Sequence, residues 1–305
     1  MRLMNISIIF VLGAGAIGSV VGGFLSKKNN VKIVGSKTHV QAVKSKGLSI
    51  TGDVDEIIQL KADTRIRAIP KKALIILTTK AYDSAKAIKM IKNLLRKDTI
   101  ILILQNGLGN EEAVREVIGN KNEILRMVTT MAAEFFEPGK VRFWNGETLI
   151  EHTEDGEEIA EIFNRCRLKT RLTKDISREI WIKLTVNCVV NPLSALFHVR
   201  NPELASDSLR SIRHGIMKEC FEVAKAEGMP PIEDQQGTVN RRVFSKPNFS
   251  SMCQDIVKGK RTEIDFLNGK IVELGKKHHI STPINETLTS LIRFLEEKNE
   301  LSRKH

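Results

Sequence analysis

The sequence has little of what metal centres and disulfide frameworks require. Its 305 residues include four cysteines, none of which forms a C-x-x-C pair: Cys166, Cys188, Cys220 and Cys253. The seven histidines do not cluster beside them, so we expect neither a metal site nor a disulfide scaffold. Single buried thiols in a reducing compartment are the simpler expectation, which favours a cytoplasmic protein.

Aromatic side chains and runs of like charge are also scarce. There is one tyrosine, and no block of five or six like charges occurs, although 48 basic and 36 acidic residues give a net charge of +12. Scattered positive charge favours anionic small molecules such as phosphates and acids. A basic nucleic-acid-binding protein is a weaker alternative, because base-stacking platforms require aromatic side chains. We therefore expect a small-molecule substrate and no nucleic acid.

Charged residues are absent from Met4 to Leu25, and Arg2 precedes this run. A signal peptide or a membrane helix would have a similar composition. The run nevertheless contains too many glycines for a signal core, namely Gly13, Gly15, Gly18, Gly22 and Gly23. No other membrane-spanning candidate and no lipidation signal is found, so we expect no membrane association.

The glycines belong to a dinucleotide-binding pattern. Asn5 to Leu12 is a short apolar, β-branched run that predicts a strand buried on both faces. The sequence GAGAIG follows, then an apolar helix to about Ser26 and a second strand from Val31 to Val34. The loop residues are Gly13, Ala14, Gly15, Ala16, Ile17 and Gly18. A strand, glycine turn, helix and strand within about 30 residues is the context that this fingerprint requires.

Each glycine of the loop has a physical task. Gly13 allows the tight turn, Gly15 lets the backbone approach a pyrophosphate, and Gly18 lets the helix lie close to the strand. The free N–H groups at the helix N-terminus then face the phosphates. A glycine-rich turn that binds no ligand is the alternative.

The end of the second strand bears on the choice of cofactor. NAD enzymes usually carry Asp or Glu there, whereas this chain reads Gly35-Ser36-Lys37. Ser36 and Lys37 could hold a 2′-phosphate by hydrogen bond and charge, so we predict NADPH. Lys37 as an ordinary exposed lysine is the alternative.

Two further strands end in polar residues. Ala73–Leu77 leads to Lys80, and Thr99–Leu104 leads to Asn106. Ligands bind at the carboxyl ends of strands in open parallel sheets, so both residues are candidates for a site. A loop residue or a helix cap is the alternative for each. The remaining predicted elements of this half are strands at 122–130, 141–150 and 169–172, and helices at 86–95 and 157–167.

Strand signals stop after Thr173, and the apolar pattern becomes helical. We therefore predict an α/β Rossmann-type parallel-sheet domain over residues 1–174, followed by an all-α domain over residues 175–305. Prolines should interrupt the helices near 192, 202, 230, 247 and 283. Residues 233–250 are polar and predict a connecting loop.

The stretch from Trp181 to Asn201 is mostly apolar, but Lys183, Asn187 and Asn191 interrupt it at intervals of four residues. This spacing puts the three side chains in one stripe of a helix. A lysine and two amides in so apolar a helix need partners or a wet cleft. Pro192 should kink or stop the helix and free backbone groups. The alternative is a core helix whose lysine reaches solvent.

Two polar groups follow in the second half. Ser251 with Gln254 forms a capping-box pattern, and Glu263 could be an acid in the first turn of a helix. Spacing alone favours these structural roles over functional ones.

Five motifs in order resemble the ketopantoate reductase (2-dehydropantoate 2-reductase) family over nearly the whole chain. They are GAGAIG at 13–18, LTTKAYD at 77–83, LQNGLGNEE at 104–112, KLTVNCVVNPLSAL at 183–196 and SSMCQDIVKGKRTEIDFLNG at 250–269. The resemblance implies a Rossmann domain joined to a helical domain. It also implies reduction of ketopantoate to pantoate with NADPH, on the route to pantothenate and coenzyme A.

The resemblance also implies roles for single residues. Lys183 matches the general acid, and Asn106 matches an asparagine shared between cofactor and substrate. The substrate-binding positions are Asn187, Asn191, Asn201 and Ser251. The cofactor positions are the glycine loop, Lys80, Ala133 and Glu263. Many members carry an arginine where this chain has Ser36, so use of NADH stays open.

Several alternatives stay open from the sequence. Another NAD(P)-dependent 2-keto acid reductase would use the same loop and lysine. A non-catalytic dinucleotide sensor would keep residues 13–18 without needing the polar stripe. The apolar C-terminal helices could form a homodimer face as easily as a core.

Overall fold

The computed structural model describes residues 6–230, 237 and 246–302. The chain divides into two compact units, one of residues 1–105 and 109–176, and one of residues 106–108 and 177–305. The connecting loop predicted at 233–250 falls outside the described residues, apart from 237 and 246–250.

The first unit contains all the strands found in the described residues. They are β1 (Ile8–Leu12), β2 (Val31–Val34), β3 (Leu48–Gly52), β4 (Glu56–Ile58), β5 (Lys61–Asp63), β6 (Ala73–Leu77), β7 (Ile100–Ile103), β8 (Ile124–Thr129), β9 (Ala132–Glu137), β10 (Lys140–Trp144), β11 (Thr148–Glu151) and β12 (Thr170–Thr173). Its helices are α1 (Ala16–Ser26), α2 (Lys37–Lys46), η1 (Ala81–Asp83), α3 (Ser84–Ile91), η2 (Lys92–Leu94), α4 (Asn110–Ile118) and α5 (Glu154–Arg165).

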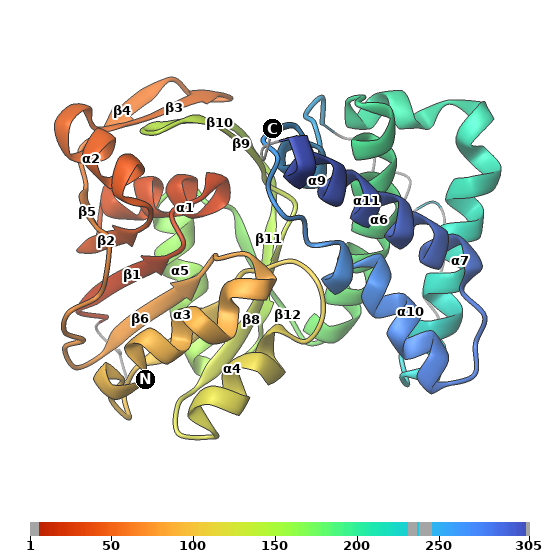
Figure 1. The fold of residues 1–305 in the computed structure, drawn as a ribbon. Helices are drawn as coiled ribbons and strands as arrows, with labels where there is room; N and C mark the ends of the chain where they lie inside the picture. Colours follow the sequence, from red (N-terminus) through yellow and green to blue (C-terminus); the bar gives the residue numbers. More distant parts are fainter. Residues whose placement is uncertain (1–5, 231–236, 238–245, 303–305) are drawn as a thin grey trace. The chain divides into compact units, whose positions relative to one another are not determined.

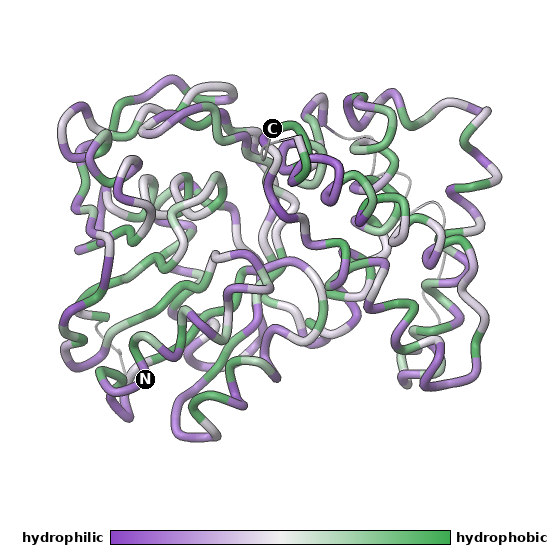
Figure 2. The backbone as a smooth tube through the Cα atoms, viewed as in Figure 1, coloured by the Kyte–Doolittle hydropathy of each residue, from purple (hydrophilic) through white to green (hydrophobic). Residues whose placement is uncertain are grey.

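Eight strands form the main sheet, in the order β12-β11-β8-β7-β6-β1-β2-β5. All neighbours pair in parallel except β11 with β8. β6 is buried at every position, and β1 and β6 are drawn hydrophobic along most of their length (Figure 2). Continuous apolar runs are expected where helices cover both faces of a parallel sheet.

Alternate residues of β1 pack into two different cores. Ile9 and Val11 join a core with α1 and α5, whereas Phe10 and Leu12 join a core with α3 and α4. Since successive strand residues point to opposite faces, the helices cover both sides of the sheet. This is the doubly wound arrangement of the predicted Rossmann-type domain (Figure 1).

A second sheet was not predicted. Its strand order is β4-β3-β10-β9, and α1 lies between it and the main sheet (Figure 1). The single strand predicted at 141–150 is wrong, because it contains β10 of this sheet and β11 of the main sheet. Asn145 and Gly146 make the break, where the N–H of Asn145 donates to Asp53 Oδ2 at 2.7 Å.

The second unit is helical. It contains α6 (Ile176–Phe197), η3 (Asn201–Ala205), η4 (Asp207–Leu209), α7 (Arg210–Ala226), α9 (Ser251–Val257), η5 (Ile264–Phe266), α10 (Asn268–Lys277) and α11 (Pro283–Ser302). One apolar core joins α6, α7, α10 and α11. Glu219 on α7 accepts the N–H groups of Ile284 and Asn285, both at 2.9 Å, and so caps the start of α11. The predicted fold class, α/β followed by a helical region, is confirmed.

Pro192 does not stop its helix, because α6 continues for five residues beyond it. Proline has no N–H, so the carbonyl of Cys188 loses its usual partner four residues on. The side-chain amide of Asn268 replaces it, with Nδ2 at 3.0 Å from the Cys188 oxygen. A freed backbone group was predicted here, and a buried side chain satisfies it.

Among the described residues, α6 is the one helix long and apolar enough to cross a membrane. However, 78% of its most apolar stretch is buried inside the protein, as is usual for a core helix. All four cysteines lie in the described part of the chain, are buried and form no disulfide with one another.

Candidate functional site

The glycine turn lies at the carboxyl end of β1 and is fixed by the two strands beside it. The N–H groups of Gly13 and Ala14 donate to the carbonyl of Val34, at 3.0 and 2.8 Å. On the other side, Thr78 Oγ1 donates to the carbonyl of Gly13 at 2.9 Å. Gly13 has φ +115°, a conformation that residues with a side chain rarely adopt. Gly15 is then the N-cap of α1 in an extended conformation, and it makes no side-chain capping hydrogen bond.

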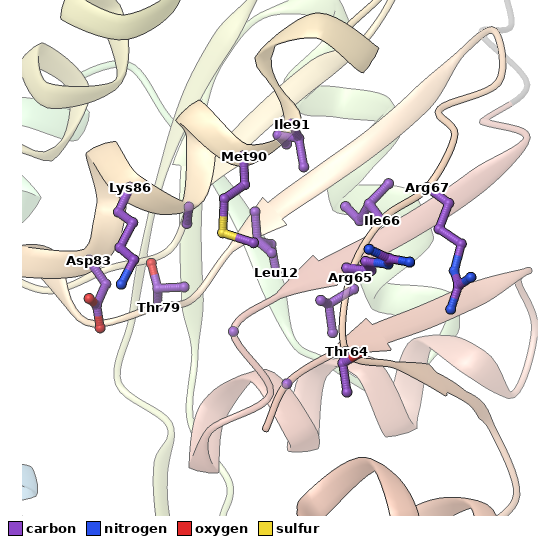
Figure 3. Close-up of a pocket in the computed structure, with 14 residues that line it drawn as sticks. Leu12, Thr64, Arg65, Ile66, Arg67, Thr79, Asp83, Lys86, Met90 and Ile91 are labelled. Atoms are coloured by element: carbon purple, nitrogen blue, oxygen red, sulfur yellow. The ribbon is translucent and has the colours of Figure 1, made fainter. Parts of the chain in front are cut away.

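A cavity of about 770 Å³ opens beside this turn (Figure 3). Leu12, Gly13, Val34 and Gly35 line it from the ends of β1 and β2, and residues 64–67 line it after β5. Thr79 and residues of η1 and α3 complete the wall. The volume suits a ligand of nucleoside size, and the position is the carboxyl edge where parallel sheets bind ligands.

Of the residues predicted to bind the cofactor, Gly13 lines this cavity. Lys37 begins α2 and is exposed. Ser36 is the N-cap of α2 and accepts the N–H of His39 at 3.4 Å. Lys80 follows β6 as the N-cap of η1 and is half-buried.

Gln105, which sequence reasoning passed over, joins the ends of β6 and β7. Its Nε2 lies 2.7 Å from the carbonyl oxygen of Thr79 and 2.7 Å from Ser84 Oγ. Its Oε1 is buried and has no hydrogen-bond partner among the described residues. The motif LQNG contained this signal, but only Asn106 was selected from it. Asn106 itself lies in the short segment that belongs to the helical unit.

The predicted polar stripe is present on α6. Asn187 and Asn191 are 6% and 5% exposed, and Lys183, one turn earlier, is half-buried. Apolar side chains on the other faces, including Leu184, Cys188 and Leu193, belong to the core of the second unit. The stripe therefore runs along a helix that is otherwise embedded in its core.

The start of α9 is attached to the same part of α6. Ser250 Oγ donates to the carbonyl of Asn191 at 3.3 Å and accepts the N–H of Cys253 at 3.1 Å. Ser250, not Ser251, is therefore the N-cap. The capping role considered for Ser251 is wrong, and the half-buried Ser251 begins the helix beside the polar stripe.

Asn201 joins this group through Asn248, which the sequence analysis did not select. The N–H of Asn201 donates to the carbonyl of Asn248 at 3.0 Å, and the two side chains are 3.3 Å apart. The second unit thus brings Asn191, Asn201 and Ser251 onto one connected framework.

Three buried amide atoms in this unit have no hydrogen-bond partner among the described residues. They are Nδ2 of Asn187, Oδ1 of Asn201 and Oδ1 of Asn268, and the first two belong to predicted substrate residues. A buried polar atom without a partner costs free energy, on the order of 1–3 kcal/mol. One donor and one acceptor left open at the predicted substrate residues indicate a site for a polar ligand.

Two predicted site residues remain, Glu263 in the second unit and Ala133 in the first. Glu263 is 6% exposed and precedes η5, so it does not stand in the first turn of an α-helix. Ala133 is the second residue of β9 and pairs with Phe143, because the chain turns after β8 and starts a new strand.

Among residues 6–230, 237 and 246–302, no group of three or more His, Cys, Asp or Glu side chains is placed to hold a metal ion.

Two family models match the chain. Residues 9–154 match Ketopantoate reductase PanE/ApbA, and residues 175–296 match Ketopantoate reductase PanE/ApbA C terminal. A 2-dehydropantoate 2-reductase of Pyrococcus horikoshii is 39% identical over 295 residues, covering 93% of this chain and 96% of that protein.

Solved structures are similar over the same length. A PanE/ApbA family ketopantoate reductase from Ralstonia eutropha has a TM-score of 0.87 at 32% identity, covering 96% of this chain and 99% of that one. D-mandelate dehydrogenase with NADH and anilino(oxo)acetate has a TM-score of 0.88 at 29% identity, with the same coverage.

Proposed function

Since the chain belongs to the ketopantoate reductase family, we propose that it is a 2-dehydropantoate 2-reductase that reduces ketopantoate to pantoate with NADPH. One observation of the structure carries the proposal beyond family membership. The helix α6 holds a half-buried lysine and two buried asparagines in one stripe, and Nδ2 of Asn187 has no hydrogen-bond partner in the described part of the chain.

The first unit offers what a dinucleotide requires. The N-cap of α1 is Gly15, which makes no side-chain capping hydrogen bond, so the N–H groups and positive dipole end of the helix can face a pyrophosphate. The neighbouring cavity has the volume for an adenosine. The bound nicotinamide supplies the hydride.

The second unit offers what a hydroxy keto acid requires. Asn187 has an open N–H donor and Asn201 an open acceptor, which match a carbonyl or carboxylate oxygen and a hydroxyl of the substrate. The hydroxyl of Ser251 and the amide of Asn191 add further donors for the substrate carboxylate. Because the framework fixes these groups, little of the binding energy is lost in ordering them.

Lys183 acts as the general acid. Hydride transfer leaves negative charge on the former keto oxygen, which needs a proton and a positive charge nearby. The ammonium of Lys183 provides both. Its place one turn before Asn187 puts the proton donor beside the group that orients the substrate. Asn106, Lys80, Ala133 and Glu263 are proposed as further contacts of cofactor or substrate.

The rival function is another NAD(P)H-dependent 2-keto acid reductase. The similarity to D-mandelate dehydrogenase favours this second candidate, since the fold is shared at a TM-score of 0.88. A single assay separates the candidates: consumption of NADPH and of NADH, side by side, with ketopantoate and a panel of other 2-keto acids.

We expect ketopantoate with NADPH to give the highest kcat/KM. Faster turnover of a different keto acid would favour the rival. Dinucleotide binding without turnover of any keto acid would favour a sensor. On the proposed function the chain acts in pantothenate and coenzyme A biosynthesis in the cytoplasm, with which four buried cysteines without disulfides agree. A homodimer stays a prediction.

A further inference from the structure

The strand β5 brings a basic segment to the place where the cofactor's ribose is expected. β5 pairs in parallel with β2, with Val34 opposite Asp63. The N–H of Gly35 donates to the carbonyl of Asp63 at 3.2 Å, so the pairing continues to the strand ends. Residues 64–67 therefore leave the sheet beside Gly35 and Ser36, where dinucleotide-binding domains select the ribose 2′ group.

The residues at the end of β2, namely Gly35, Ser36 and Lys37, do not themselves select the group at the ribose 2′ position. A Cβ at Gly35 would lie 2.8 Å from the Cβ of Ala14, so there is no room for an acidic side chain. The hydroxyl of Ser36 accepts the N–H of His39, and Lys37 does not line the cavity. The side chain that recognises the 2′ group of the ribose must therefore come from another segment of the chain.

Figure 3 shows Arg65 and Arg67 on one wall of the cavity, across from Lys86 and Met90. The wall with Lys86 also carries Asp83, so its formal charges cancel. The opposite wall carries two arginines, and Ile66 between them is buried and fixes the segment. The charge of the cavity is therefore concentrated beside the end of β2.

The two arginines differ in their partners. Asp63 accepts the N–H of Thr64 at 2.7 Å, and its Oδ2 lies 3.8 Å from Nε of Arg67. The Thr64 N–H, with Arg67 nearby, lowers the pKa of the Asp63 carboxyl, which keeps it ionised and partly neutralises Arg67. Arg65 is exposed and forms no ion pair with any described residue. Its guanidinium is the one available for a ligand anion.

We propose that Arg65, assisted by Arg67, binds the 2′-phosphate of the adenosine half of NADPH. This inference rests on the proposed function and assigns its cofactor preference to the segment after β5 instead of to Lys37. A guanidinium can donate two parallel hydrogen bonds to a phosphate, which an ammonium cannot do. The 2′-hydroxyl of NADH offers no charge for this contact.

The test measures binding of two adenosine fragments, 2′,5′-ADP and 5′-AMP, by titration calorimetry. The proteins are the wild type, Arg65→Ala, Arg65→Lys, Arg67→Ala and Lys37→Ala. Lys61→Ala is the matched control, because Lys61 is exposed at the opposite end of β5 and its loss changes the net charge equally. Melting temperatures check that each variant is folded.

We expect the wild type to prefer 2′,5′-ADP. Arg65→Ala should weaken that ligand at least tenfold, about 1.4 kcal/mol, and leave 5′-AMP within about twofold. Arg65→Lys should restore only part of the loss, Arg67→Ala should lose less than Arg65→Ala, and Lys61→Ala should bind as the wild type.

The inference is overturned if Arg65→Ala weakens both fragments equally or neither, if Lys37→Ala alone removes the preference, or if the wild type has none. The fragments contain neither nicotinamide nor keto acid. Failure to turn over ketopantoate would therefore reject the proposed function while leaving this binding result to stand.

Discussion

The carbonyl oxygen of Gly13 occupies the space that a side chain at Gly18 would need. A Cβ built at Gly18 would lie 2.2 Å from that oxygen. Gly15 differs, because its Cβ would have no heavy atom closer than the Gly13 oxygen, at 4.0 Å. The protein's own packing requires the glycine at 18, but it leaves space at 15.

Substitutions at the two glycines should therefore distinguish an effect on stability from an effect on ligand binding. Gly18→Ala should destabilise the protein by about 1–3 kcal/mol, because α1 must move away from the turn. Gly15→Ala should leave the melting temperature nearly unchanged and weaken NADPH binding by about tenfold or more, because the added methyl group would meet the pyrophosphate. Thermal unfolding and NADPH titration of both variants check this. A Gly15→Ala protein that binds NADPH like the wild type would show that no phosphate approaches the turn.

Lys183→Ala should lower kcat by about 100-fold or more, with a smaller effect on KM, since the proton donor acts mainly in the transition state. Lys183→Arg should also be slow, because a guanidinium keeps the charge but does not release a proton. Steady-state kinetics with ketopantoate give both values. Lys218→Ala, on an exposed lysine of α7, is the control for loss of one charge. Wild-type turnover by Lys183→Ala would remove Lys183 from the mechanism.

Substitution of the adjacent serines Ser250 and Ser251 should have different effects. Ser250→Ala loses the N-cap of α9 and should cost about 1 kcal/mol of stability. Ser251→Ala keeps the cap and should raise KM for ketopantoate more than it lowers kcat, since a ground-state contact is lost. Urea unfolding and steady-state kinetics of the pair distinguish them. An unchanged KM in Ser251→Ala would mean that the hydroxyl does not touch substrate.

The buried His39 should make stability depend on pH. Its Nδ1 accepts the N–H of Gly139 at 3.0 Å, and its Nε2 lies 3.0 Å from Ser19 Oγ. Burial lowers the pKa of this imidazole below its ordinary value of 6.5. The unfolded chain therefore takes up a proton first as the pH falls through about 6.5, and the folded state loses stability until the lowered pKa is reached.

The loss at this histidine is at most about 1.4 kcal/mol per pH unit. His39→Asn, whose Oδ1 can accept the Gly139 N–H, should be less stable at neutral pH but lose less on acidification. Urea unfolding of both proteins at about pH 7.5 and 5.5 measures the difference. Equal losses in the two proteins would mean that another group titrates.

The sequence predicted the elements whose signals are local. β1, β2, β6 and β7 are short apolar runs, and the glycine turn has its own spacing, so each could be recognised within a few residues. The stripe on α6 was predictable for the same reason, because three positions along one helix determine it.

The second sheet could not be found in this way. β4 has three residues, and β10 pairs in parallel with β3, about 90 residues earlier in the chain. A pairing of this kind depends on the whole fold, and the turn at Asn145-Gly146 was the one local sign that 141–150 is not a single strand.

Arg65 was missed because its neighbour in space is distant in sequence. Nothing near ADTRIRAIP indicates a nucleotide, and only the pairing of β5 with β2 brings it to the cavity. The capping role was placed one residue too late, at Ser251 instead of Ser250, because two consecutive serines offer the same capping pattern.

Asn268 and Pro192 are linked through the carbonyl oxygen of Cys188. That oxygen accepts the side-chain amide of Asn268 because Pro192 has no N–H to donate to it. An ordinary residue at 192 would supply its own N–H to that oxygen and compete with the asparagine for it. Losing Asn268 while keeping the proline would instead bury a carbonyl without a donor. Substitutions at the two positions should therefore be non-additive, and related chains should exchange them together more often than separately.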